Sequence, residues 1–229
     1  MGTHTWPGHD HDDGPLDVGP PRIRFGLTEI LHLLGAVVVL TFAVSLAREF
    51  IPGPPRPLPE RLLPDPIILL GSALAVGSGF TLHELAHKIV AQRYGHWAEF
   101  RAQFGSLLLS YILCAATGFL FAAPGAVLIQ GRVTPRESGL ISLVGPGVNF
   151  VLAAILWPFT FVASGPAGQV LGIVVYANAL LGLFNLLPVG PLDGRKVLRW
   201  SGWVYALSVL ASLALFVAIL ATSGGIPGF

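Results

Sequence analysis

The sequence predicts an all-α polytopic membrane protein with five or six transmembrane helices and a short membrane-edge β-hairpin. Of its 229 residues, 53% are hydrophobic and only 11% are charged, and the mean hydropathy is +0.73. Soluble domains carry about 25% charged residues, so this composition excludes an ordinary soluble domain. Several apolar stretches also reach about 20 residues, the length at which a helix crosses a bilayer.

Five apolar segments are expected to span the membrane, at about 27–47, 66–92, 139–163, 169–187 and 203–223. A further apolar segment, 106–123, lies between two short runs that alternate like β-strands, 97–104 and 126–133. These two runs supply the predicted hairpin. The number of spans depends on whether 106–123 crosses the membrane.

The first 25 residues are rich in Gly, Pro and Asp and are expected to form a disordered tail. The HDHDD stretch at 9–13 is interpreted as a solvated acidic segment rather than a metal site. Such a polar start does not fit a cleavable signal peptide, so the first span is expected to be a retained anchor. A Pro-rich stretch, 52–66, is expected to be an extended, stiff linker. Residues 26–229 would then form one membrane-embedded domain.

The charge and cysteine content exclude two classes of function. A formal net charge of +1 gives no basic surface for nucleic acid, and no nucleic-acid partner is expected. The single cysteine, Cys114, excludes an intramolecular disulfide framework and a zinc cluster made of thiolates alone.

The second predicted span carries an H-E-x-x-H motif, His83-Glu84-Leu85-Ala86-His87. On a helix, residues i and i+4 lie about 40° apart in azimuth and about 6 Å apart along the axis. Both imidazoles therefore leave one face and can share a Zn²⁺ ion, with Glu84 placed to accept a proton from an activated water. Lys88 either pairs with Glu84 on the helix surface or extends to an aqueous edge. Because ionisable groups at membrane depth are costly, the motif predicts a functional site.

Catalytic zinc takes three protein ligands and an open position, so a third ligand is needed. Asp193 follows the fourth predicted span in NLLPVGPLDG, where Pro188 and Pro191 break the helix. Irregular backbone at membrane depth is tolerated where it is buried in protein or lines a watery cavity. That setting suits a zinc ligand. The alternative is an ordinary loop aspartate beside Arg195 and Lys196.

Three motifs, in this order, resemble those of the site-2 protease family of intramembrane zinc metalloproteases. HELAH at 83–87 looks like the family's H-E-x-x-H helix, and GPGVN at 145–149 looks like its G-P-x-x-N element. NLLPVGPLDG at 185–194 looks like its N-x-x-P-x-x-x-x-D-G element. The resemblance covers about 66–200 and is to a compact form, since these residues contain no segment like the PDZ or CBS domains of many members.

The resemblance implies zinc bound by His83, His87 and Asp193, with Glu84 as general base and proton shuttle. It further implies that Asn185 and Asn149 hold the substrate strand or polarise the scissile carbonyl.

The implied activity is hydrolysis of peptide bonds within or near transmembrane helices, as in regulated intramembrane proteolysis. Its partners would be transmembrane-helix substrates and the lipid bilayer, and the run 126–133 would be the edge strand on which an unwound substrate docks. The oligomeric state is not predicted. The alternative function is a metal-handling membrane protein without proteolysis, a transporter or sensor, which gives no reason for Glu84 to lie beside His83.

The positions of the ligands bear on the topology. His83 and His87 lie in the later half of the second span, and Asp193 lies just beyond the fourth, so these spans should run in the same direction. They do so if 106–123 is a re-entrant or interfacial helix whose flanking strands pair. Most Lys and Arg residues then fall on the side of the N-terminus, which predicts a cytoplasmic N-terminus by the positive-inside rule. The compact chain fits a prokaryotic plasma membrane.

Overall fold

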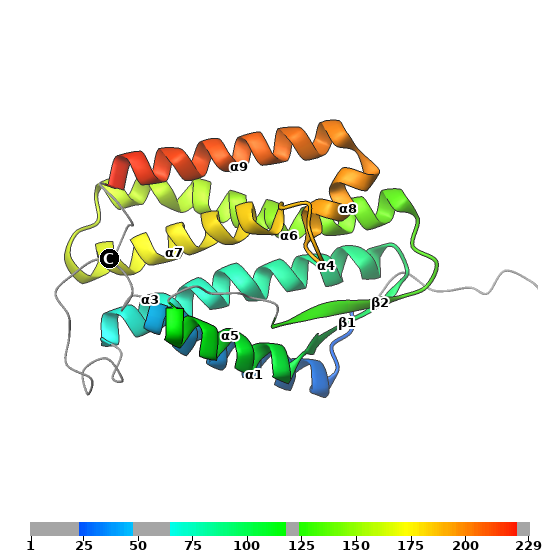
Figure 1. The fold of residues 1–229 in the computed structure, drawn as a ribbon, viewed down its shortest axis with the longest axis horizontal. Helices are drawn as coiled ribbons and strands as arrows, with labels where there is room; N and C mark the ends of the chain where they lie inside the picture. The colour runs from blue at the N-terminus through cyan, green and yellow to red at the C-terminus, as the bar shows by residue number, and fades with distance from the viewer. Residues whose placement is uncertain (1–22, 48–64, 118–123, 224–229) are drawn as a thin grey trace, which may run out of the picture.

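The computed structural model describes residues 23–47, 65–117 and 124–223. The expected disordered tail (all but its last three residues), its HDHDD stretch and nearly all of the Pro-rich linker lie outside the described residues. Within the described part of the chain, five helical segments are long and apolar enough to cross a membrane. They run side by side along the long axis of the molecule (Figure 1). The predicted polytopic helical fold is confirmed.

The five membrane-spanning segments occupy the positions that the apolar stretches predict. They are α1 (Leu27–Ala47), α3 (Pro66–Val76) with α4 (Leu82–Arg93), α6 (Pro135–Leu156), α7 (Gly165–Asn185) and α9 (Gly202–Ser223). A single π-helical turn, η2 (Gly77–Thr81), joins α3 to α4, and a 3₁₀ turn, η3 (Trp157–Phe161), extends α6. π-helical turns inside α-helices occur mostly at functional sites, and this one directly precedes the H-E-x-x-H motif.

Helix α6 begins four residues before the predicted start of its span. Thr134 accepts a hydrogen bond from the Glu137 N–H, and the Glu137 side chain accepts from the Thr134 N–H in return. This capping box satisfies two backbone donors at the helix end, and Pro135 supplies a helical φ at the first position. The cap therefore fixes the start of the helix, independently of hydropathy.

The second and fourth spans run in the same direction, as the ligand positions required. The Gly71 backbone on α3 lies against the Ile173 side chain on α7. Further along both helices, the Asn178 amide donates to Ser78 Oγ at 3.3 Å. Residue numbers thus increase together along the two helices, so the ends that carry the motif and the Asp193 loop lie at the same end of the bundle.

Strands β1 (Trp97–Ala102) and β2 (Gly125–Gln130) pair antiparallel, with Trp97 opposite Gln130 and Ala102 opposite Gly125. Helix α5 (Phe104–Thr117) begins directly after β1. Because Ala102 and Gly125 are paired, the chain returns to the side from which α5 starts. The expected pairing of the two strands is confirmed.

Helix α5 lies beside α1 and runs in the same direction as that span. Near its start the ring of Phe104 packs edge-on against His32 at 5.3 Å, and further along Cys114 Sγ lies 2.9 Å from the Ala43 carbonyl oxygen. Helix α5 thus lies along a span, and its re-entrant or interfacial position in the membrane stays a prediction.

Polar side chains occupy the outer edge of β1. Glu29 accepts from the Phe100 N–H, His32 accepts from the Ala102 N–H, and Gln92 donates to the Ala98 carbonyl. In an antiparallel pair, alternate residues direct their backbone groups to opposite edges. The β2 residues paired with Ala98, Phe100 and Ala102 therefore direct their backbone N–H and C=O groups away from β1. These residues are Gly125, Val127 and Ile129, and we call them the open edge of β2.

Lys88 forms a fully buried ion pair with Glu29, and its ammonium lies 4.1 Å from the centre of the Phe25 ring. Both interpretations of Lys88 from the sequence are therefore wrong, since it neither pairs with Glu84 nor extends to an aqueous edge. This buried ion pair links the start of α1 to α4, the helix that carries the H-E-x-x-H motif, and Glu29 extends the connection to β1.

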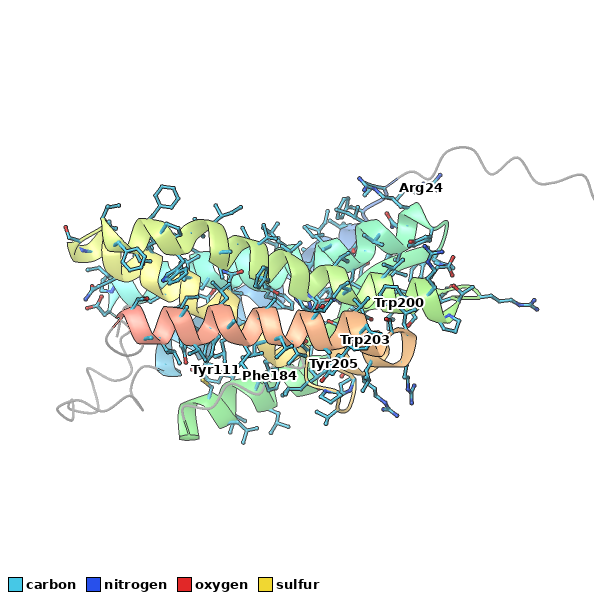
Figure 2. The ribbon with its side chains drawn as sticks, turned by 90° about the horizontal axis from the view of Figure 1, so that it is seen from above. Arg24, Tyr111, Phe184, Trp200, Trp203 and Tyr205 are labelled. Carbon is cyan, nitrogen blue, oxygen red and sulfur yellow. The ribbon has the colours of Figure 1, made fainter. Side chains whose placement is uncertain are left out.

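Aromatic residues mark one end of the bundle. Trp200, Trp203 and Tyr205 lie around the start of α9, and Arg24 lies toward the same end (Figure 2). Trp203 is 83% exposed. Tryptophan and tyrosine gather at the level of the lipid headgroups, so this end of the bundle is positioned at a membrane surface.

Candidate metal centre

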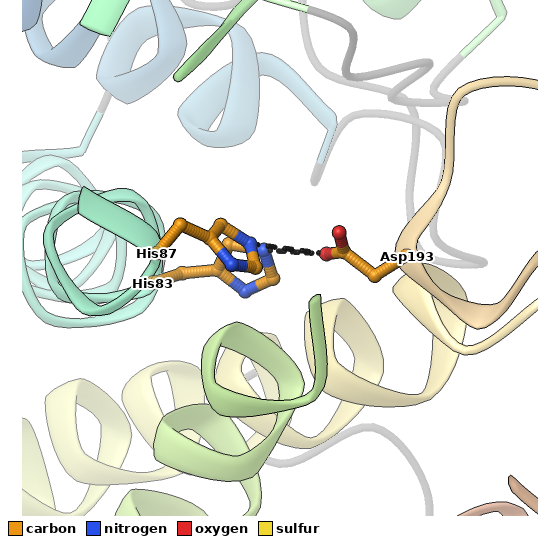
Figure 3. A group of neighbouring side chains, drawn as sticks. All are labelled: His83, His87 and Asp193. Carbon is orange, nitrogen blue, oxygen red and sulfur yellow. Dashed lines mark hydrogen bonds and ion pairs between the residues drawn. The ribbon is translucent and has the colours of Figure 1, made fainter. Parts of the chain in front are cut away.

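Three side chains from two separate helices converge at the predicted site. His83 and His87 project from one face of α4 toward Asp193, the first residue of α8 (Asp193–Trp200) (Figure 3). Asp193 Oδ2 lies 3.2 Å from His83 Nε2 and 3.1 Å from His87 Nε2, and all three residues are buried. Within the described residues, these three form the one group of His, Cys, Asp or Glu side chains spaced to hold a metal ion.

The donors and their spacing fit zinc. Zn²⁺ binds imidazole nitrogen and carboxylate oxygen at about 2.0–2.1 Å, which places neighbouring donors of a tetrahedral site about 3.3 Å apart. The two distances from Asp193 Oδ2 come close to that value. Two histidines and one carboxylate are also the ligand set of one class of catalytic zinc site, which keeps its fourth position open.

The second ring nitrogen of each histidine has a partner of its own. His87 Nδ1 lies 2.6 Å from the Ile141 carbonyl oxygen, and His83 Nδ1 lies 2.6 Å from Asn149 Oδ1. A carbonyl oxygen can only accept, so Nδ1 of His87 carries a proton and Nε2 is the nitrogen left to bind a metal ion. Such partners fix the tautomer and the ring orientation of metal-binding histidines.

Asp193 begins a short helix rather than lying in an irregular loop, and the sequence reasoning missed this helix. Gly194 allows it to form here, because a Cβ at that position would lie 2.8 Å from the Leu187 carbonyl oxygen and still closer to that of Leu186. The start of α8 can therefore pack against the end of α7. The segment 186–192 between the two helices is irregular, as the prolines predicted.

The charge state of Asp193 suits a metal ligand. Burial alone would raise the pKa of its carboxyl, but the imidazoles of His87 and His83 outweigh that cost and hold the pKa well below its usual range. Lys196 Nζ lies 3.7 Å from the other carboxylate oxygen, Oδ1. Asp193 is therefore a carboxylate throughout the physiological pH range.

The three ligands line a cleft of about 360 Å³. Glu84 and Asn185 line the same cleft, and so do the residues of the open edge of β2. Glu84 is not part of the three-residue metal group. The Asn185 amide donates to the Leu181 carbonyl at 3.0 Å, which holds the side chain at the end of α7 beside the cleft.

Asn149 lies behind His83 instead of facing the cleft. It is fully buried, and its amide nitrogen donates to the Gly79 carbonyl and to Asn178 Oδ1, both at 3.0 Å. With its oxygen on His83, both ends of the amide are occupied. This geometry gives no support to the substrate contact expected for Asn149.

Asn178 is a buried polar residue that the sequence reasoning missed. It stands in the middle of the fourth apolar span, in the run VVYANALLG. A polar side chain there is a recognisable signal, because asparagine within a span usually hydrogen-bonds to a neighbouring helix.

Comparisons with known proteins agree with this geometry. The family model described as peptidase family M50 matches residues 71–169. One similar protein comes from Methanocaldococcus jannaschii and carries the provisional name of a zinc metalloprotease. It is 36% identical to this chain over 188 residues, which cover 80% of this chain and 90% of the archaeal protein. A second protein of that archaeon, named a zinc metalloprotease, is 31% identical over 121 residues, covering 52% of this chain and 30% of its own length. No solved structure gave a significant match.

Proposed function

This chain belongs to peptidase family M50 and is a membrane zinc metalloprotease, and we propose that it cleaves peptide bonds within or near transmembrane helices of other membrane proteins. Such an activity belongs to regulated intramembrane proteolysis. The observation that carries the proposal is the position of the metal group. His83, His87 and Asp193 meet inside a bundle of spans, at a cleft that the open edge of β2 also lines.

We assign the zinc ligands as His83, His87 and Asp193. Bound zinc lowers the pKa of water to about 7 and polarises a carbonyl oxygen. Each histidine offers Nε2, because Nδ1 is engaged behind the ring. Asn149 acts as a positioning residue for His83 rather than as a substrate contact.

Glu84 is the general base. It lines the cleft beside both histidines without being part of the metal group. Its carboxylate accepts the proton of the attacking water as the new C–O bond forms, and then donates it to the amide nitrogen as the C–N bond breaks. Asn185 at the rim of the cleft has amide capacity beyond its bond to Leu181, and it contacts the scissile peptide or its neighbour.

The substrate binds as an extended strand on β2. A helical peptide bond has its N–H and C=O groups occupied, so the substrate must unwind before it reaches the metal. Strand addition then pairs its free backbone groups with an exposed sheet edge. The open edge of β2 supports this mode, because the described residues contain no strand beyond it and Ile129 directs its backbone groups there. The Val127 N–H at the same edge donates to the Glu84 carboxylate, which places the proposed base next to the docking strand.

The distribution of basic residues indicates how the protein is oriented in its membrane. We place the N-terminus and the Asp193 loop on the cytoplasmic side of a prokaryotic plasma membrane. The exposed Arg195, Lys196 and Arg199 of α8 support this orientation by the positive-inside rule.

The test uses purified protein in lipid nanodiscs with a single transmembrane segment fused between two soluble tags. A segment with a central Gly-Pro pair should be cut, and its all-leucine counterpart should be cut far more slowly, because it resists unwinding. A chelator should stop cleavage and added zinc should restore it. Rapid cleavage of a soluble, unstructured peptide together with an intact membrane substrate would contradict the proposed substrate class.

A further inference from the structure

We propose that Asn178, acting through Asn149, holds Nδ1 of His83 as a hydrogen-bond donor and thereby keeps Nε2 as the nitrogen that binds zinc. Asn178 is then a positioning residue two hydrogen bonds away from the ligand. The inference rests on the zinc ligands proposed above. His83 differs in this respect from His87, whose Nδ1 is fixed directly by the Ile141 backbone carbonyl.

The chain of hydrogen bonds starts from groups that can act only as acceptors toward Asn178. Ser78 Oγ lies 2.7 Å from the Leu74 carbonyl oxygen and donates its one proton there. Toward Asn178 it can therefore only accept, at 3.3 Å. The Val174 carbonyl, 2.9 Å from the same amide, is an acceptor as well. Both partners demand a donor, so the NH₂ group of Asn178 must face them.

Asn178 and the Gly79 carbonyl together determine the orientation of Asn149. With its NH₂ committed, Asn178 turns its oxygen toward Asn149, 3.0 Å away. The Gly79 carbonyl oxygen, also 3.0 Å away, makes the same demand for a donor. The NH₂ group of Asn149 therefore faces Asn178 and Gly79, and its oxygen is left for His83.

His83 completes the relay. Its Nδ1 lies 2.6 Å from Asn149 Oδ1 and must donate, which leaves Nε2, directed at Asp193, as the nitrogen that can bind a metal ion. Both asparagines are fully buried, so no bulk water competes for these groups. An amide turned the wrong way would put two acceptors face to face inside the protein and leave both of them unsatisfied, which is unfavourable.

The π-helical turn η2 supplies part of this network. Gly79 lies in that turn, and a Cβ there would lie 3.4 Å from Asn178 Oδ1 and 3.6 Å from the Asn149 amide nitrogen. Because the turn packs this closely against the two asparagines, the Gly79 carbonyl lies within hydrogen-bond distance of Asn149. The irregular turn before the H-E-x-x-H helix thus has a direct connection to the orientation of His83.

The first measurement is made on the wild-type protein, and variants serve only to assign its signals. In metal-free protein labelled with ¹⁵N-histidine, His83 should show a protonated Nδ1, as His87 should. Assignment uses the His83→Gln and His87→Gln proteins. An unprotonated Nδ1 on His83 in the wild-type protein would overturn the inference.

The second measurement compares Asn178→Leu with Ser72→Ala by competition with a zinc-binding dye. Ser72 is an equally buried polar residue in the same bundle whose hydroxyl has no hydrogen-bond partner, which makes it a matched control. Loss of an outer partner of a metal ligand costs roughly 10–100-fold in metal affinity. Asn178→Leu should weaken zinc binding about 10-fold and leave Nδ1 of His83 partly unprotonated in the metal-free protein, whereas Ser72→Ala should change neither.

The outcomes separate this inference from the assignment of the ligands. Wild-type zinc affinity in Asn178→Leu would overturn the role of Asn178 and leave the ligand set intact. Undiminished zinc binding in the His83→Gln protein would instead contradict the ligand set. Should Asn178→Leu fail to accumulate, Asn178→Ala and the wild-type tautomer measurement decide the question.

Discussion

Gly145 of α6 lies directly against the His83 and His87 pair. A Cβ at this position would lie 2.7 Å from His83 Nε2 and closer still to His87 Nε2. Real Cβ atoms essentially never come that close to another atom, so any side chain here would displace the ligand atoms themselves. The glycine of GPGVN is thus explained by the space that two metal-binding imidazoles occupy.

Gly145→Ala should therefore abolish activity and weaken zinc binding by at least 10-fold, because the added methyl group moves the ligands from their positions. Overpacking of this kind also costs about 1–3 kcal/mol of stability. The matched control is Gly147→Ala in the same motif, where a Cβ meets nothing within 4 Å. The control should keep full activity and zinc content. Equal behaviour of the two variants in dye competition and cleavage assays would refute the assigned packing.

Asp193→Ala should lower zinc affinity at least as much as the loss of an outer-shell group, roughly 10–100-fold. The comparison is Asp65→Ala. Asp65 caps α3 by accepting from the Ile67 N–H at 2.8 Å and lies outside the metal group. Its loss should cost about 1 kcal/mol of stability and leave zinc binding unchanged. A chelator titration of both proteins decides, and unaltered affinity in Asp193→Ala would require a different third ligand.

Lys88→Met should destabilise the protein by about 3–5 kcal/mol, because it leaves the Glu29 carboxylate buried without a cation. In the double variant Lys88→Met/Glu29→Gln no unpaired charge remains, and the amide oxygen introduced by the second substitution can still accept from the Phe100 N–H. The double variant should therefore melt closer to wild type than the single one. Thermal denaturation in detergent measures the order of the three melting temperatures, and a double variant less stable than Lys88→Met would contradict this account.

The topology is testable by cysteine labelling. With Cys114 replaced, single cysteines at the exposed positions Gln103 and Thr134 should react with an impermeant thiol reagent from the same side of the membrane, because the pairing of β1 with β2 returns the chain to that side. Labelling of one position in intact cells and of the other only after lysis would show that α5 crosses the membrane.

The sequence alone predicted the parts of the structure that depend on hydropathy and on short motifs. The five spans and the two strands lie within a few residues of their predicted positions. Asp193 was reached by asking which polar residue at membrane depth could complete a zinc site, and the structure brings it to His83 and His87. These features depend on local pattern, which a single chain displays.

Features that depend on contacts between distant segments were not predictable in the same way. The pairing of Lys88 with Glu29, 59 residues away, needs the packing of α1 on α4. The position of Asn149 behind His83 likewise needs α6 to run past the motif helix. Two short sequence patterns do indicate features of the structure that hydropathy alone missed. The Thr134–Glu137 capping box marks the true start of α6, and Asn178 marks a polar contact within a span.

The central claim is that Glu84 acts as a base beside a zinc ion held by His83, His87 and Asp193. Glu84→Gln keeps the size of the side chain and removes its capacity to accept a proton. Zinc content and cleavage of a transmembrane substrate should be measured on one preparation of this variant, with His87→Gln as the comparison that loses metal. The account predicts stoichiometric zinc and no cleavage in Glu84→Gln. Near-wild-type cleavage, or loss of the zinc together with activity, would contradict it.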